Sequence, residues 1–192
     1  MSGRWPRLSN HSAQVSTVVH VREARPDELP QIAALTMIAY GEYATIMHRD
    51  SWTGLEGALR QSLADGTGVT RLVAEIDGEI AGSAALYDPG VDAYGSLASR
   101  ANCPEVRLVA VAPSARGRGI AGALVSECVR RARAAGATEL GLHTSSSMSA
   151  AMRLYERMGF VRDPSSDFQP PGAELVQGYR LSLGDHEPTT ER

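Results

Sequence analysis

The sequence contains no lysine, so all 19 of its basic residues are arginine. Its two cysteines, Cys103 and Cys128, are too few for a disulfide framework, and its histidines and cysteines lack the spacing of metal ligands. No apolar run approaches the length of a membrane-spanning helix, and residues 1–16 lack the apolar core of a secretory signal. We therefore expect a cytoplasmic protein that binds no metal and no membrane.

Length and charge set further limits. The 192 residues, of which 43% are hydrophobic, suffice for one domain with a sizeable core. The formal charge of −3 argues against a general affinity for nucleic acid. Both ends of the chain are polar, so we expect tails at 1–16 and 184–192 around a single domain at 17–183.

Hydrophobic periodicity and turn residues divide this domain into alternating elements. Strands are predicted at 17–23, 69–76, 79–87, 105–111, 138–144, 160–162 and 175–183. Helices are predicted after Asp27, at 51–64, from Ile120 to about Gly136, and at 148–158, with Asp27 and Ser147 as N-caps. Asp77-Gly78 is a hairpin signal. The order β-α-α-β-β-β-α-β-α-β-β indicates a mixed α/β fold.

The most informative stretch joins the predicted strand at 105–111 to the helix that begins at Ile120. Arg116, Gly117, Arg118 and Gly119 form the connecting turn. A helix start carries unpaired amides and a partial positive charge, glycines let a ligand approach the main chain, and the arginines add full charges. The turn is therefore a predicted anion site suited to a diphosphate.

Two nucleotide-binding motifs compete for the same residues. Gly117, Gly119 and Gly122 satisfy G-x-G-x-x-G, which opens dinucleotide-binding folds, although Pro113-Ser-Ala-Arg separates the first glycine from the strand. The phosphate-loop motif of nucleotide hydrolases requires a lysine and is excluded, because this sequence has none.

Two segments resemble the GNAT superfamily of N-acetyltransferases. Arg116, Gly119 and Ala121 fit its [Q/R]-x-x-G-x-[G/A] signature, and Ala151 to Phe160 looks like its helix ending in L-Y-E-x-x-G-F. The resemblance extends over about 17–183 and implies an acetyl-CoA-dependent enzyme with the GNAT-type mixed sheet. It also implies that the pantetheine arm of acetyl-CoA pairs with the main chain of one strand and that its diphosphate binds at the turn. The residues that match the strand are Val109, Ala110 and Val111. Those that match the turn are Arg116, Gly117, Arg118, Gly119, Ile120, Ala121 and Gly122.

The resemblance implies direct attack of an amine on the thioester. Tyr155 matches the general acid that protonates the departing sulfur, and Glu105 opens the strand on which family members often carry a base. The bland alternatives are a core tyrosine and a strand-end carboxylate in solvent. His143 is a lone histidine, more often structural than catalytic. Met148 replaces an asparagine that commonly contacts the cofactor in relatives, so that role is not assigned here.

The acceptor contacts implied by the resemblance come from two distant segments. Tyr40 and Tyr43 lie in the break after the first helix, and Phe168 lies in the predicted loop at 163–174. The resemblance implies that the acceptor is a primary amine of a small molecule or a protein, and a homodimer is a further prediction. The alternative function is an acyl-CoA-binding GNAT-like sensor domain without catalysis.

Overall fold

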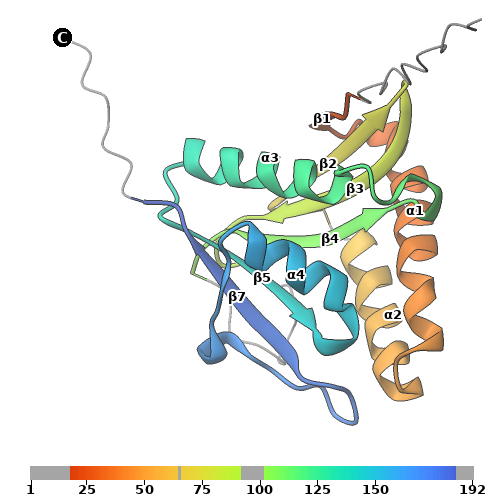
Figure 1. Ribbon diagram of the computed structural model, residues 1–192, viewed down its shortest axis with the longest axis vertical. Helices are drawn as coiled ribbons and strands as arrows, with labels where there is room; N and C mark the ends of the chain where they lie inside the picture. Colours follow the sequence, from red (N-terminus) through yellow and green to blue (C-terminus); the bar gives the residue numbers. More distant parts are fainter. Residues whose placement is uncertain (1–17, 65, 92–101, 185–192) are drawn as a thin grey trace, which may run out of the picture.

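A mixed seven-stranded sheet in the order β1-β2-β3-β4-β5-β7-β6 forms the centre of the described part of the chain (Figure 1). The computed structural model describes residues 18–64, 66–91 and 102–184. Its strands are β1 His20–Glu23, β2 Val69–Ile76, β3 Glu79–Tyr87, β4 Glu105–Val111, β5 Glu139–Ser145, β6 Val161–Arg162 and β7 Val176–Ser182. Its helices are α1 Leu29–Gly41, α2 Arg49–Ala64, α3 Ile120–Ala134 and α4 Ser149–Arg157. The predicted order of helices and strands is confirmed; the predicted tails lie outside the described residues, apart from Gly184.

The hairpin between β2 and β3 forms where the sequence predicts it. Asp77 and Gly78 have φ of 54° and 83°, and they connect Ile76 to Glu79, which pair with each other. Positive φ at both central residues matches the twist of antiparallel strands, which is why Asp-Gly is favoured at this position.

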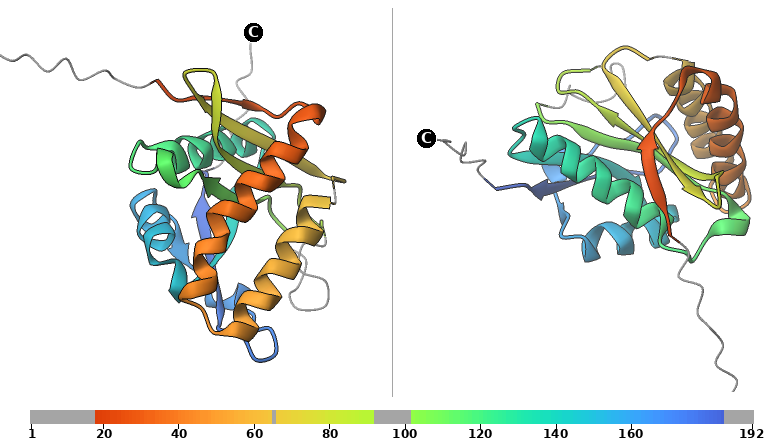
Figure 2. Two further views of the ribbon diagram at one scale, coloured as in Figure 1. Left: turned by 90° about the vertical axis from the view of Figure 1, so that its right-hand side faces the viewer. Right: turned by 90° about the horizontal axis from the view of Figure 1, so that it is seen from above.

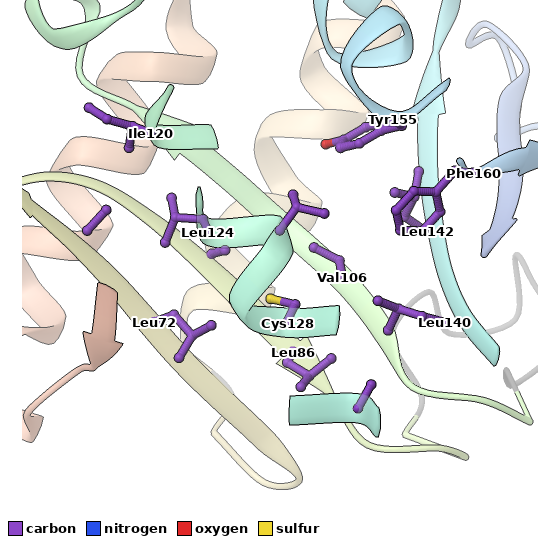
Figure 3. Close-up of a cluster of buried hydrophobic side chains, with 14 of the residues drawn as sticks. Leu72, Leu86, Val106, Ile120, Leu124, Cys128, Leu140, Leu142, Tyr155 and Phe160 are labelled. Atoms are coloured by element: carbon purple, nitrogen blue, oxygen red, sulfur yellow. The ribbon is translucent and has the colours of Figure 1, made fainter. Parts of the chain in front are cut away.

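Helices α3 and α4 cover one face of the sheet, and α1 and α2 cover the other (Figure 2). Leu124, Val125 and Cys128 of α3 are fully buried, in a core that includes side chains from β2 to β5 and from α4 (Figure 3). Val106 points into this core, so strand alternation places Glu105 and Arg107 on the α1–α2 face. The same alternation places Leu142 in the core and His143 on the α1–α2 face.

The two central strands separate soon after they meet. Strands β4 and β5 are parallel and pair only at Glu105–Gly141 and Val106–Leu142, after which they diverge (Figure 1). On the other side of β4, the register with β3 shifts so that Leu108 and Val109 lie opposite Ala84. Leu108 has φ of 54°, and an extra residue of this kind bends a strand. The C-terminal half of β4 therefore has an edge that β5 does not cover.

Two predicted helix caps are wrong. A 3-10 turn, Pro26–Glu28, precedes α1, and Asp27 contacts Arg25 at 3.5 Å instead of capping the helix. A second 3-10 turn, Ser146–Met148, precedes α4, whose N-cap is Met148. Ser147 is not the cap because its hydroxyl donates to Oε2 of Glu174 at 3.1 Å. At α4 a contact with a residue distant in sequence replaces the local cap, whereas at α1 the first turn is a 3-10 turn and Glu28 is the N-cap.

Candidate active site

The turn at Arg116–Gly119 presents its main chain at the surface where α3 begins. All four residues are exposed. Gly117 and Gly119 have φ of 75° and 79°, in the left-handed region that glycine adopts readily. A Cβ at either position would meet no atom of the described residues within 4 Å, so the space over both glycines is open. Because first-turn amides of a helix lack main-chain partners, this geometry fits an approaching diphosphate.

The two arginines of the turn add positive charge in different ways. Arg116 forms an ion pair with Glu42, and its Nη2 reaches the main-chain oxygen of Ala39 at 3.4 Å. The side chains of Arg116 and Glu42 are 45% and 51% exposed, so solvent weakens their pair and the guanidinium remains within reach of an anion. Arg118 is exposed beside the two glycines. Arg116 thus also connects the turn to the end of α1, which the sequence did not indicate.

The open edge of β4 lies next to this turn. Ala110 is buried against Leu35 and Ala39 of α1, whereas Val109 and Val111 are partly buried and pack against the α3-side core. Their strand pairs with β3 on one side, and among the described residues its ladder with β5 ends at Val106. An extended ligand can therefore pair with the main chain of β4 where the two strands diverge.

Tyr155 lies on the α3–α4 side of this divergence. Its side chain belongs to the core cluster, with the residue 7% exposed, and its ring packs edge-on against Phe160 with centroids 6.0 Å apart. In Figure 3 its hydroxyl points away from Phe160. A Cβ at Gly122 would lie 3.8 Å from Leu154, so α4 approaches the first turn of α3 next to Tyr155. The ring of Tyr155 contributes to core packing, and its hydroxyl is the group that can take part in chemistry.

Glu105 is not a solvent-exposed carboxylate, because it is only 6% exposed on the opposite face of the sheet. Its Oε1 lies 3.2 Å from Nδ1 of His143, and Nε2 of His143 lies 2.9 Å from the main-chain oxygen of Ser166. Sequence reasoning gave His143 no role. Glu105 pairs with Gly141, and His143 follows Gly141 by two residues on the same strand. The nearness of His143 to Glu105 can therefore be recognised only when the strand pairing is known.

The predicted acceptor contacts gather on the same face as Glu105. The ring of Phe168 packs against His143 with centroids 5.4 Å apart, and the rings of Tyr40 and Tyr43 are 6.0 Å apart at the end of α1. Burial raises the pKa of Tyr40 well above its usual value, while the positive charge of Arg107 opposes this shift. Burial also raises the pKa of Tyr43. Both hydroxyls therefore stay protonated at neutral pH and can donate hydrogen bonds.

The segment from Asp163 to Leu175 is fastened over this face by Glu174. Its Oε2 accepts hydrogen bonds from the hydroxyls of Ser146 and Ser147 at 2.9 and 3.1 Å. Its main-chain nitrogen donates to the hydroxyl of Ser51 in α2 at 3.1 Å. These contacts join the end of β5, the start of α2 and the segment that carries Phe168. The sequence gave no indication of them, because the partners are far apart in the chain.

Other kinds of site find no support in the described residues. Within 18–64, 66–91 and 102–184, no group of three or more His, Cys, Asp or Glu side chains is placed to hold a metal ion. No helix of the same residues is long and apolar enough to cross a membrane. The dinucleotide alternative is wrong for this fold, because a doubly wound parallel sheet is required and here β4 and β5 are the parallel neighbours in a mostly antiparallel sheet.

Comparison with known proteins agrees with this geometry. The model of the acetyltransferase (GNAT) family matches residues 32–160, which include the glycine turn and Tyr155. Among curated protein sequences, none matches this chain. Solved structures with the same fold are numerous.

Three solved structures illustrate the likeness. A GNAT family acetyltransferase from Brucella melitensis, in complex with acetyl-CoA, is 25% identical with a TM-score of 0.54, and the alignment covers 90% of this chain and 92% of that one. The ribosomal-protein-S18-alanine N-acetyltransferase from Escherichia coli is 16% identical with a TM-score of 0.61, covering 91% and 100%. An acetyltransferase of the GNAT family from Staphylococcus aureus is 17% identical with a TM-score of 0.59, covering 86% and 99%.

Proposed function

The chain belongs to the acetyltransferase (GNAT) family, and from this premise we propose that it transfers an acetyl group from acetyl-CoA to a primary amine by direct attack. The observation that carries the proposal is the open glycine turn at the start of α3, next to the diverging strands β4 and β5. Tyr155 and Glu105 lie on opposite faces of the sheet near this divergence. Donor and acceptor can then approach from opposite faces and react between the strands.

We assign binding sites to two parts of the donor acetyl-CoA, its diphosphate and its pantetheine arm. We assign its diphosphate to the main chain from Arg116 to Gly122 and its pantetheine arm to the edge of β4 at Val109, Ala110 and Val111. The Brucella melitensis neighbour, solved with acetyl-CoA, supports the choice of donor. The bulge at Leu108 turns main-chain groups out of the ladder at the divergence, where an amide can stabilise negative charge on the thioester oxygen.

The amine must lose a proton before or during the attack. An aliphatic amine has a pKa of ~10 and is almost wholly protonated at neutral pH. We assign Glu105 as the group that receives this proton, directly or through water, because it lies at the acceptor face beside the divergence. The nitrogen then forms a bond to the carbonyl carbon and loses its second proton to solvent, and the carbon–sulfur bond breaks with its electron pair on sulfur.

The departing sulfur takes up a proton in the last step. We assign Tyr155 as the donor, since a thiol titrates near ~8.5 and a tyrosine near ~10, which keeps the transfer feasible. The hydroxyl of Tyr155 points away from Phe160, and its ring is fixed by core packing (Figure 3). A proton returned from solvent restores the hydroxyl of Tyr155, and Glu105 releases its proton to solvent, which readies both groups for the next cycle.

The acceptor is assigned only by class, as a small molecule or protein that bears a primary amine. Tyr40, Tyr43 and Phe168 are its proposed contacts, because they share the face that holds Glu105. A cytoplasmic location and a possible homodimer remain predictions from the sequence.

The direct test is release of free thiol from acetyl-CoA in the presence of a panel of primary amines. The proposal expects thiol release that depends on both the protein and one or more amines. Tight binding of CoA with no release for any amine would instead favour the alternative, a sensor domain that binds acyl-CoA without catalysis.

The acid assignment is tested by Tyr155→Phe, which keeps the ring against Phe160 and removes the hydroxyl. We expect kcat to fall by about 10²–10⁴ while CoA affinity is unchanged, because the proton is needed only in the transition state. Tyr179→Phe is the matched control, since it also removes a hydroxyl from a buried ring and has no proposed role. Wild-type kcat in folded Tyr155→Phe would remove Tyr155 from the mechanism.

A further inference from the structure

Arg116 connects the proposed donor turn to the region of the proposed acceptor contacts. Its Nη1 donates a hydrogen bond to Oε2 of Glu42, which follows α1, and its Nη2 donates to the main-chain oxygen of Ala39 at 3.4 Å. These two partners lie on either side of Tyr40 in the chain, and Glu42 directly precedes Tyr43. One guanidinium therefore reaches from the glycine turn to the segment that carries two proposed acceptor contacts.

The main chain at the end of α1 is held in place, whereas the side chains of the ion pair are open to solvent. Ala39 is buried against Ala110 of β4, and the main-chain oxygen of Glu42 accepts a hydrogen bond from the hydroxyl of Thr45 at 2.9 Å. The side chains of Arg116 and Glu42 are 45% and 51% exposed. Because an exposed ion pair contributes little free energy, this one can exchange partners without a movement of the helix.

The charges of this ion pair act on the hydroxyl of Tyr43. Burial raises the pKa of Tyr43, the positive charge of Arg116 opposes that shift, and the negative charge of Glu42 adds to it. The ring centroid of Tyr43 lies 6.0 Å from that of Tyr40. Both members of the ion pair are therefore within electrostatic range of the proposed acceptor contacts, so a change of partner at Arg116 alters the field at that site.

A diphosphate bound at the glycine turn would lie beside the same guanidinium. The space over Gly117 and Gly119 is open, and the first amides of α3 hold the anion there. A guanidinium binds phosphate oxygens through paired N–H groups, and a diphosphate carries more negative charge than one carboxylate. Once the amides hold the diphosphate next to Arg116, it displaces the carboxylate of Glu42.

We propose that Arg116 exchanges Glu42 for the diphosphate of the donor, and that the released carboxylate of Glu42 then attracts the amine of the acceptor. The inference rests on the proposed function, because it takes acetyl-CoA as the donor and an amine as the acceptor. Before the donor binds, the two side chains neutralise each other; afterwards Arg116 belongs to the donor site and Glu42 to the acceptor site. Since an aliphatic amine is almost wholly protonated at neutral pH, the acceptor arrives as a cation and is drawn to this carboxylate.

Calorimetric titration of CoA into four proteins tests the exchange: the wild type, Glu42→Gln, Arg116→Gln and the double variant. Glu42→Gln removes the competing charge and keeps the side-chain length, so the Kd of CoA should fall by about 2- to 5-fold, the range of an exposed ion pair. In the Arg116→Gln background, Glu42→Gln should leave Kd unchanged, because there is no guanidinium to release. An equal fall in both backgrounds would overturn the exchange, and so would an unchanged or raised Kd in the single Glu42→Gln variant.

Glu42→Gln should have the opposite effect on the acceptor. In steady-state thiol release at saturating acetyl-CoA, the KM of the best amine should rise by about 3-fold or more. A glutamate that only supports the end of α1 would weaken both ligands or neither. The matched control is Glu23→Gln, which removes a carboxylate from the ion pair with Arg131 at the other end of α3 and should change neither value. An unchanged or lower amine KM in Glu42→Gln would overturn the role of Glu42 towards the acceptor.

The inference and the proposed function can fail separately. If CoA binds but no amine yields free thiol, the proposed function fails and the acceptor role of Glu42 fails with it, while the four titrations still decide the exchange at Arg116. If thiol is released but the two substitutions act independently on CoA affinity, the function stands and the exchange is overturned. If the wild type does not bind CoA, both are overturned.

Discussion

Two glycines at the start of α3 should respond in opposite directions to the same substitution. Gly119 is the N-cap, with φ of 79° and ψ of 2°, whereas Gly122 lies within the first turn of the helix. A Cβ at Gly119 would meet nothing within 4 Å, and one at Gly122 would lie 3.8 Å from Leu154, an ordinary contact. Neighbouring atoms therefore penalise neither change, and backbone conformation alone sets the sign.

The magnitudes follow from that conformation. Left-handed backbone costs a residue with a Cβ about 1–2 kcal/mol, so Gly119→Ala should destabilise the protein by about 1 kcal/mol. Alanine is favoured over glycine in a helix, so Gly122→Ala should stabilise it by about 0.5 kcal/mol. In a protein of this size, about 1.5 kcal/mol between the variants corresponds to a Tm difference of roughly 3–6 °C.

The assay is urea and thermal unfolding of both variants and the wild type without CoA, so that ligand binding does not contribute. Equal m-values would show that the variants unfold the same structure. If both substitutions shift stability in the same direction, the left-handed conformation of Gly119 is wrong, and with it the geometry of the proposed diphosphate site.

Three further outcomes are expected. Gly119→Asp should weaken CoA binding by about 100-fold in calorimetry, or about 2.7 kcal/mol, because it adds a negative charge where the diphosphate approaches; unchanged affinity in a folded variant would refute the site. Gly82→Ala should destabilise the protein by about 1–3 kcal/mol, because its Cβ would lie 2.7 Å from Ile120 and 2.9 Å from the main-chain oxygen of Ala110. Hydrogen bonds from Arg22 hold the pKa of Glu28 at about 2. A lowered pKa stabilises the fold above about pH 4.5, so Glu28→Gln should lower Tm at neutral pH, and the difference should shrink as the pH falls towards about 2; a constant difference would argue against that ion pair.

Local signals in the sequence were strong for the helices, the strands and the glycine turn of the proposed donor site. Asp77-Gly78 can form its turn from its own φ preferences, and the glycines at 117 and 119 adopt positive φ in the structure. The apolar stripe of α3 and the β-branched run of β4 likewise report burial through periodicity. Each of these features is encoded within a few consecutive residues, so it can be recognised without knowledge of the fold.

Tertiary structure decided the features that depend on pairing between distant segments. The pairing of Glu105 with Gly141 brings His143 to the carboxylate, and the segment before β7 then supplies Ser166 to the same ring. Ser147 looked like a helix cap because a cap is a local pattern, but Glu174 takes its hydroxyl across 27 residues of sequence. The separation of β4 from β5 has the same origin, since it depends on how each strand pairs with its other neighbour. Such contacts are chosen by the packing of the whole sheet, and no short stretch of sequence contains them.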